Sequence, residues 1–128
     1  MSFSAKFKVA GKEYRVLDAS YELHQVTDQT GRVSSVTRGG KISISVESTQ
    51  ETDLFEWMTN SYENKEGSLV FLKRDSDATM KELKFKEAYM IDFKESFSGS
   101  NDMPMRMDFT LSAKEIEMGN GKFTNDWV

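Results

Sequence analysis

Alternation of apolar and polar residues is the dominant pattern along this chain. It runs over residues 3–9, 42–46 and 83–97, where every second side chain is apolar apart from two glutamates. A period of two places those side chains on one face of a strand. In residues 14–23 the apolar side chains stand at even-numbered positions up to Val16 and at odd-numbered positions after it, which indicates a β-bulge. The stretch 83–97 is long for a strand, since about 5–6 residues is usual, and it predicts a strand that curves around a barrel with one inner face throughout.

One segment has helical periodicity instead. Leu54, Phe55, Met58 and Tyr62 recur at spacings of three and four, and Thr52 is a suitable N-cap, so we expect a helix over about residues 52–62. Further strands are predicted at residues 69–72 and 105–113, with a hairpin turn at residues 119–121. We therefore expect one mainly β domain over residues 1–128, a small antiparallel β-barrel or sandwich of seven or eight strands with one flanking α-helix, and of these two we favour the barrel.

A long polar segment, residues 25–40, separates two of the predicted strands. Loops longer than about 12–15 residues are usually functional or disordered. This one contains three apolar residues, all valine, so it cannot form core; it also lacks proline and has few charges, unlike a disordered linker. We expect it to contact another molecule.

Composition excludes several classes of protein. The 128 residues suggest a single domain, and the absence of cysteine excludes disulfides and thiolate zinc sites. The net charge is −4 with both signs interspersed, which argues against a nucleic-acid partner. No run approaches the ~20 apolar residues of a membrane span, and we find no signal peptide. We expect a protein made in the cytoplasm that would need a dedicated machine to leave the cell.

The candidates for catalysis are weak. His24 is the only histidine, and it could act as a base toward Ser34 or Ser35, although a structural role is more usual and no strained nucleophile turn is present. Glu87 and Glu95 are separated by roughly 26 Å along one strand, too far for a glycosidase pair. We expect no catalytic residue.

Cofactor and metal motifs are incomplete. Asp75 and Asp77 resemble the start of a calcium loop, but Met80 and Lys86 stand where that loop needs Gly and Glu. The glycines at 119 and 121 do not form a dinucleotide fingerprint. Trp57 and Trp127 could stack a ligand, although core packing is more usual. We expect no cofactor and no metal.

Several motifs, in order, are similar to one family. They are Tyr21-Glu22-Leu23-His24-Gln25, Thr37-Arg38-Gly39-Gly40-Lys41, Leu54-Phe55-Glu56-Trp57-Met58, residues 74–85, and residues 109–113 with Trp127-Val128. Together they resemble the haemolysin-coregulated proteins, the tube subunits of type VI secretion systems, in the Bacteroidetes-type branch. Val33 stands where that branch leads us to expect proline. The resemblance implies a β-barrel with a flanking helix, sixfold rings and a stacked hollow tube.

The resemblance also implies partners. These are further copies of the chain, a contractile sheath that expels the tube, spike and baseplate proteins, and small effectors inside the ring. We infer from the residues that the polar segment contacts other subunits, either in the next ring or in the same ring, with Asp28, Arg32 and Arg38 as charged contacts. The interface candidates are Gln25, Asp28, Gln29, Thr30, Gly31, Arg32, Arg38 and Trp127. Two alternatives are a small-ligand-binding barrel, with a tryptophan in its mouth, and a hydrolase using His24.

Overall fold

The computed structural model describes residues 4–73, 76, 78–100, 104–125 and 127. These residues form seven strands and one helix. In chain order the elements are β1 (Ser4–Val9), β2 (Lys12–Tyr21), β3 (Lys41–Glu47), α1 (Asp53–Thr59), β4 (Asn64–Leu72), β5 (Thr79–Ser96), β6 (Arg106–Met118) and β7 (Gly121–Thr124).

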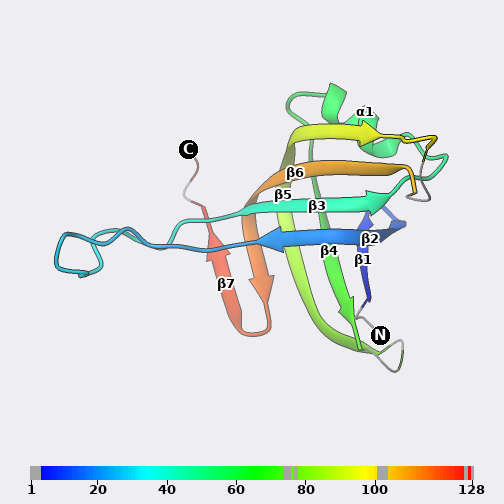
Figure 1. Ribbon diagram of the computed structural model, residues 1–128. Coiled ribbons are helices and arrows are strands. Elements are labelled where there is room, and N and C mark those ends of the chain that lie inside the picture. The colour runs from blue at the N-terminus through cyan, green and yellow to red at the C-terminus, as the bar shows by residue number, and fades with distance from the viewer. Residues whose placement is uncertain (1–3, 74–75, 77, 101–103, 126, 128) are drawn as a thin grey trace.

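The strands form a closed barrel with one extra strand. Their order is β3-β2-β1-β4-β5-β6-β7, and β3 also pairs with β6, which closes a ring of six strands (Figure 1). All pairings are antiparallel, and β7 extends β6 through a hairpin at Met118 and Gly121. The expected small antiparallel barrel with one helix is confirmed.

Two long strands change partners along their length. β2 pairs with β1 over Lys12–Arg15 and with β3 from Val16 onward. β5 pairs with β4 up to Tyr89 and with β6 over Lys84–Ser96. As a result, one side of the barrel is a four-stranded sheet in the order β2-β3-β6-β5. The predicted bulge in β2 is confirmed between Val16 and Asp18.

The prediction of one inner face along residues 83–97 is wrong. Leu83 and Phe85 point into the core, but the next buried residues are Ala88 and Met90, so the parity changes. The change falls at Glu87, whose φ of 50° lies in the left-handed region. A bulge of this kind re-aims the following side chains and bends the strand. Glu87 and Glu95 are both exposed, which suits their charge.

Aromatic side chains fill the middle of the barrel. Phe7 has its ring centroid 5.2 Å from that of Phe109, 5.9 Å from Phe85 and 6.1 Å from Tyr14. These separations are typical of favourable aromatic pairs. The barrel interior is thus a packed core, and β-branched and aliphatic side chains from every strand of the six-stranded ring complete it.

The helix is shorter than predicted and its apolar face is different. It ends at Thr59, and its buried face consists of Leu54, Trp57 and Met58. Tyr62 lies beyond the helix and is 89% exposed, so its predicted place on the apolar face is wrong. The indole of Trp57 is buried and donates to the carbonyl of Glu63 at 2.8 Å. Thr52 precedes the helix but makes no side-chain capping bond to its backbone.

Some predictions lie outside the described residues. Asp75 and Asp77, the candidate calcium ligands, and Phe3, at the start of the first predicted strand, are among them. Within the described part of the chain, the model contains no helix of the length and hydropathy that a membrane crossing requires.

Candidate functional site

The predicted polar loop is a two-stranded arm. We use the name arm for residues 22–40, which continue β2 and β3 well beyond the barrel (Figure 1). At its root the backbones of His24 and Arg38 exchange two hydrogen bonds, at 2.9 and 2.7 Å. Farther out, Thr27 and Val33 form a second isolated bridge. The pairing is sparse, but the chain runs outward and back along the direction of the two strands.

Asp28 organises the tip of the arm. Its Oδ1 atom accepts hydrogen bonds from the Thr30 hydroxyl at 2.7 Å and from the backbone N–H groups of Thr30 and Arg32 at 2.9 and 3.0 Å. These bonds, above all the one from the Thr30 hydroxyl, lower the pKa of the Asp28 carboxyl. Gly31 adopts a φ of 88°, which favours glycine. The Asp28 carboxylate therefore supports the turn itself, and the intermolecular contact expected for it stays a prediction.

The arm carries exposed apolar and cationic side chains. Val36 is 78% exposed, and Leu23, Val26 and Val33 are also largely exposed. In the described part of the chain neither Arg32 nor Arg38 forms an ion pair. The arm thus offers apolar and cationic side chains to solvent without using them internally.

Ser34 and Ser35, the two serines weighed as possible nucleophiles for His24, form hydrogen bonds with the backbone of the arm. The Ser34 hydroxyl donates to the carbonyl of Val26 at 3.1 Å. The Ser35 hydroxyl donates to the carbonyl of Val36 at 3.0 Å and accepts from the Val26 N–H at 2.9 Å. Gln25 joins this network through its side-chain amide, which donates to the carbonyl of Ser35 at 3.2 Å. These hydroxyls hold the two arm strands together.

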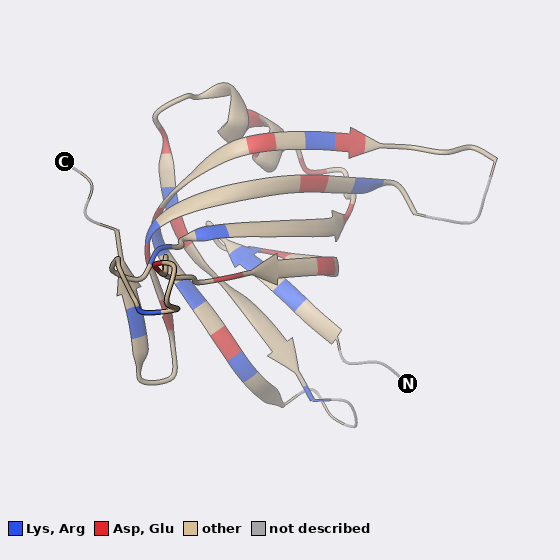
Figure 2. Ribbon diagram, turned by 60° about the vertical axis from the view of Figure 1, so that its left-hand side comes forward, with Lys and Arg blue, Asp and Glu red and all other residues tan. Residues whose placement is uncertain are grey.

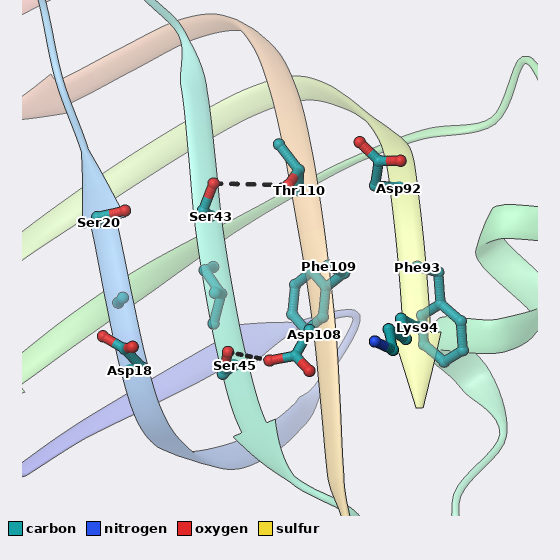
Figure 3. A pocket seen from close by; sticks show the side chains of 12 residues that line it. Asp18, Ser20, Ser43, Ser45, Asp92, Phe93, Lys94, Asp108, Phe109 and Thr110 are labelled. Atoms are coloured by element: carbon teal, nitrogen blue, oxygen red, sulfur yellow. Dashed lines mark hydrogen bonds between the residues drawn. The ribbon is translucent and has the colours of Figure 1, made fainter. Parts of the chain in front are cut away.

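The second surface is the outer face of the four-stranded sheet β2-β3-β6-β5. The strand registers place Ser20, Ser43, Thr110 and Asp92 in one row across the sheet, and Asp18, Ser45, Asp108 and Lys94 in the next row (Figure 3). All eight side chains are small or polar. The residues between these rows, among them Ile44 and Phe109, point into the core. The face contains a shallow hollow of about 300 Å³.

Asp108 is the best-connected group on this polar face. It accepts hydrogen bonds from Arg106 at 2.8 and 3.1 Å and from the Ser45 hydroxyl. Arg106 first and Ser45 second hold the pKa of the Asp108 carboxyl below its ordinary value. The carboxylate therefore stays charged near neutral pH, and Arg106 and Lys94 are the cations beside the three aspartates of the polar face.

Both edges of this sheet lack a neighbouring strand. Among the described residues, the part of β2 after Val16 pairs only with β3, and the part of β5 after Met90 pairs only with β6. Helix α1 packs beside β5 through Phe55 and Phe93, whose ring centroids are 6.0 Å apart. It makes no backbone hydrogen bond to that edge within the described ranges. Unpaired edges of this kind can accept further strands.

The remaining candidate residues lie in three different places: the core, the surface beside β5 and the arm tip. Trp57 is a core residue, whereas Trp127 is partly exposed and packs its ring 5.9 Å from that of Tyr89. Gln29, Thr30, Gly31 and Arg32 lie together at the arm tip. Acidic and basic residues are interspersed over the strands (Figure 2). The described residues contain no group of three side chains suited to hold a metal ion.

Sequence reasoning missed the polar face, although its signal is present. Ser43, Ser45, Asp108 and Thr110 occupy the positions that alternate with the apolar residues of β3 and β6. Small hydroxyl and carboxylate side chains at every such position on neighbouring strands indicate a uniform polar surface. Only the pairing of β3 with β6, distant in sequence, brings them together.

The whole chain, residues 1–128, matches the family model of the hemolysin coregulated protein Hcp (TssD). The chain belongs to this family. Hcp1 from Flavobacterium johnsoniae is 56% identical, with 96% of this chain and 100% of that chain covered and a TM-score of 0.92. That organism is a member of the Bacteroidetes, so the predicted branch is confirmed. A search of curated proteins gives no match.

More distant structures share the fold. Hcp1 from Salmonella typhimurium is 17% identical, with 97% of this chain and 93% of that chain covered and a TM-score of 0.75. A chain of the sixfold-symmetrised anti-feeding prophage baseplate is 10% identical, with 91% of each chain covered and a TM-score of 0.56. This Hcp chain is a structural tube subunit of a type VI secretion system.

Proposed function

We propose that the two surfaces have separate tasks in the tube: the four-stranded sheet joins copies into a sixfold ring, and the arm joins one ring to the next. The supporting observation is the pair of unpaired sheet edges together with an arm that runs along the strand direction. Within a ring the contacts are heterologous and close on themselves, whereas stacked rings form an open, head-to-tail series. One subunit therefore needs two kinds of contact.

Strand direction favours edge-to-edge ring closure. β2, β3, β6 and β5 alternate in direction, because each pairs antiparallel with the next. Placing the β5 edge of one copy beside the β2 edge of the next copy continues this alternation. Backbone hydrogen bonds then satisfy both edges, as in any closed barrel.

In such a ring the polar face lines the lumen. The core lies on the other face of the same sheet, so Ser20, Ser43 and Thr110 point toward the axis of the ring. Short hydroxyl and carboxylate side chains give a hydrated wall without apolar patches. Small effectors passing along this lumen would meet weak, reversible polar contacts.

The same arrangement directs the arm toward the next ring. Strands in a closed barrel are tilted by about 35–45° from its axis, so an arm that continues β2 and β3 has a large axial component. Val36 and Arg32 would then meet a neighbouring ring. Interfaces with exposed polar rims are well suited to reversible assembly. The contractile sheath, spike and baseplate complete the partners of the tube, which leaves the cell through the type VI machine.

Ring closure can be tested by disulfide cross-linking, because the chain has no native cysteine. We expect at least one of the double variants S20C/D92C, S20C/K94C, D18C/D92C and D18C/K94C to give an oxidised ladder of up to six linked copies. Within one subunit β2 and β5 lie three strand spacings apart, about 14 Å, beyond the reach of a disulfide. Rings that form without any cross-linked ladder would rule out this interface.

The role of the arm can be tested by charge reversal. Six equivalent contacts join two rings, so losing about 0.5 kcal/mol at each sums to about 3 kcal/mol, a more than hundredfold loss of stacking affinity. We expect R32E to keep hexamers in native mass spectrometry and to lose stacked tubes in negative-stain images. The control K6E makes the same charge change on β1. Equal loss of rings and tubes in R32E would contradict the axial assignment.

A further inference from the structure

The tail after β7 crosses the root of the arm and binds it. The side-chain Nδ2 of Asn125 donates to the carbonyl of Ala113 on β6 at 3.0 Å and to the carbonyl of Gly39 in the arm at 3.2 Å. The Asn125 backbone N–H donates to the carbonyl of Lys114 at 2.6 Å. One side chain thus bridges the barrel and the returning strand of the arm.

Two glycines make this close contact possible. A Cβ atom on Gly40 would lie 2.6 Å from both the Ala113 oxygen and Asn125 Nδ2, and Gly40 has a φ of +100°. A Cβ atom on Gly39 would lie 2.4 Å from the side chain of Leu23, on the outgoing strand of the arm. Any larger residue at these positions would separate the arm root from the tail or from its own partner strand.

The root is the only described place where hydrogen bonds tie the arm to the barrel. Besides Asn125, the Ala113 N–H donates to the carbonyl of Gly40 at 2.8 Å. Apart from these contacts, the described residues of the arm hydrogen-bond only to one another, through the backbone pairs His24–Arg38 and Thr27–Val33, the side chains of Gln25, Ser34 and Ser35, and the tip turn. A small change of angle at the root would therefore displace the tip by a much larger distance.

We propose that Asn125 is a positioning residue for assembly: its side-chain amide fixes the direction in which the arm leaves the barrel. This inference rests on the proposed role of the arm in joining rings. An arm held in its binding direction loses less conformational freedom when six arms engage a neighbouring ring together. Trp127, packed on Tyr89 of β5, holds the end of the same tail against the barrel.

The test is the pair of variants N125D and N125A. N125D keeps the shape of the side chain, removes both N–H donors and places a carboxylate against two carbonyl oxygens, while N125A removes the side chain. We expect hydrogen exchange at the amides of Ala113, His24 and Arg38 to accelerate about tenfold, since a tenfold change is about 1.4 kcal/mol, the net worth of one or two hydrogen bonds. The amides of β1 and β4 should exchange as in the unchanged protein.

Assembly is measured on the same samples. We expect both variants to form rings in native mass spectrometry and to form tubes at a stacking affinity lowered about tenfold in each case. R32E serves as the control, because it should weaken stacking without changing exchange at the arm root. If Asn125 only stabilised the fold, N125D and N125A would lower the melting temperature and the yield of rings, and not stacking alone.

A double-mutant cycle with G40A checks that the two residues act at one contact. G40A strains its own backbone in either background, so this contribution cancels in the cycle. We expect G40A to accelerate exchange at Ala113 much less in the N125A background than in the unchanged protein. Additive effects would show that Gly40 and Asn125 act independently.

The outcomes separate this inference from the proposed function. Unchanged exchange at the arm root in both Asn125 variants would overturn the positioning role. Faster exchange with unchanged stacking, while R32E still weakens stacking, would also overturn it, because the direction of the arm would then be irrelevant. Unchanged stacking in R32E would instead refute the proposed task of the arm, and exchange alone would then decide whether Asn125 holds the root.

Discussion

The barrel and the arm share two strands, β2 and β3, but differ in what stabilises them. In the barrel, β2 and β3 place Tyr14, Ile42 and Ile44 in a packed core. In the arm, the same two strands continue without a core, and their valines face solvent. The barrel is therefore stabilised by its own interior, whereas the arm holds its shape through local hydrogen bonds and, under the proposed function, gains buried area by meeting another copy.

This contrast explains how one small chain can be both a rigid part and an assembling part. Substitutions in the barrel core should change the free energy of unfolding, and substitutions in the arm should change the association of one ring with the next. Asn125 lies at the boundary, since it bonds to both regions. The following predictions test how sharp that boundary is.

The largest expected effect is on the barrel. W57A removes a fully buried indole and its hydrogen bond to Glu63, and it should lower the free energy of unfolding by about 3–5 kcal/mol. Urea unfolding measures the loss, which is a large share of a total stability of about 5–15 kcal/mol, and rings should disappear at the urea concentration at which the fold is lost. If W57A kept its stability but lost tubes, the division between barrel and arm would be wrong.

A smaller effect of opposite sign is expected at Tyr14. Its hydroxyl is buried and has no hydrogen-bond partner among the described residues, and burial is the main cause that raises its pKa. Y14F removes this unsatisfied group and should stabilise the barrel by about 1 kcal/mol, with assembly unchanged. Y89F is the control, since the Tyr89 hydroxyl accepts from Asn64 at 3.3 Å. A lower melting temperature in Y14F would contradict the prediction.

The smallest global effect is expected at the arm tip. The pKa of Asp28 is lower in the folded arm than in the unfolded chain. The carboxylate therefore stabilises the turn fully at pH values above the ordinary aspartate pKa, about 3.9. This stabilisation is lost as the pH falls through the lowered pKa. The protection of the Thr30 and Arg32 amides, measured by NMR relative to the intrinsic exchange rate at each pH, should therefore fall at acidic pH. The melting temperature of D28A at neutral pH should stay constant. D18A, at an exposed barrel carboxylate, should leave these amides unchanged.

Periodicity determined much of the fold. The alternation along β1, β3 and β6 reflects a face that must be buried, so the local pattern alone located those strands and the bulge in β2. The motifs of the chain also identified its family, which the match over residues 1–128 confirms. In β5 the same argument failed at Glu87. Its left-handed backbone conformation reverses which of the following side chains face the core, and the alternation of residue types does not show this reversal.

Tertiary structure alone decided how the surfaces are composed. The sequence by itself singled out residues 25–40 as a segment that does not belong to a core, but its pairing as an arm depends on backbone bonds such as His24–Arg38. The polar face requires β3 beside β6, and the arm root requires Asn125 beside Gly39, 86 positions away in the chain. Local patterns report whether a side chain is buried; contacts between distant segments depend on the path of the whole chain, which periodicity does not encode.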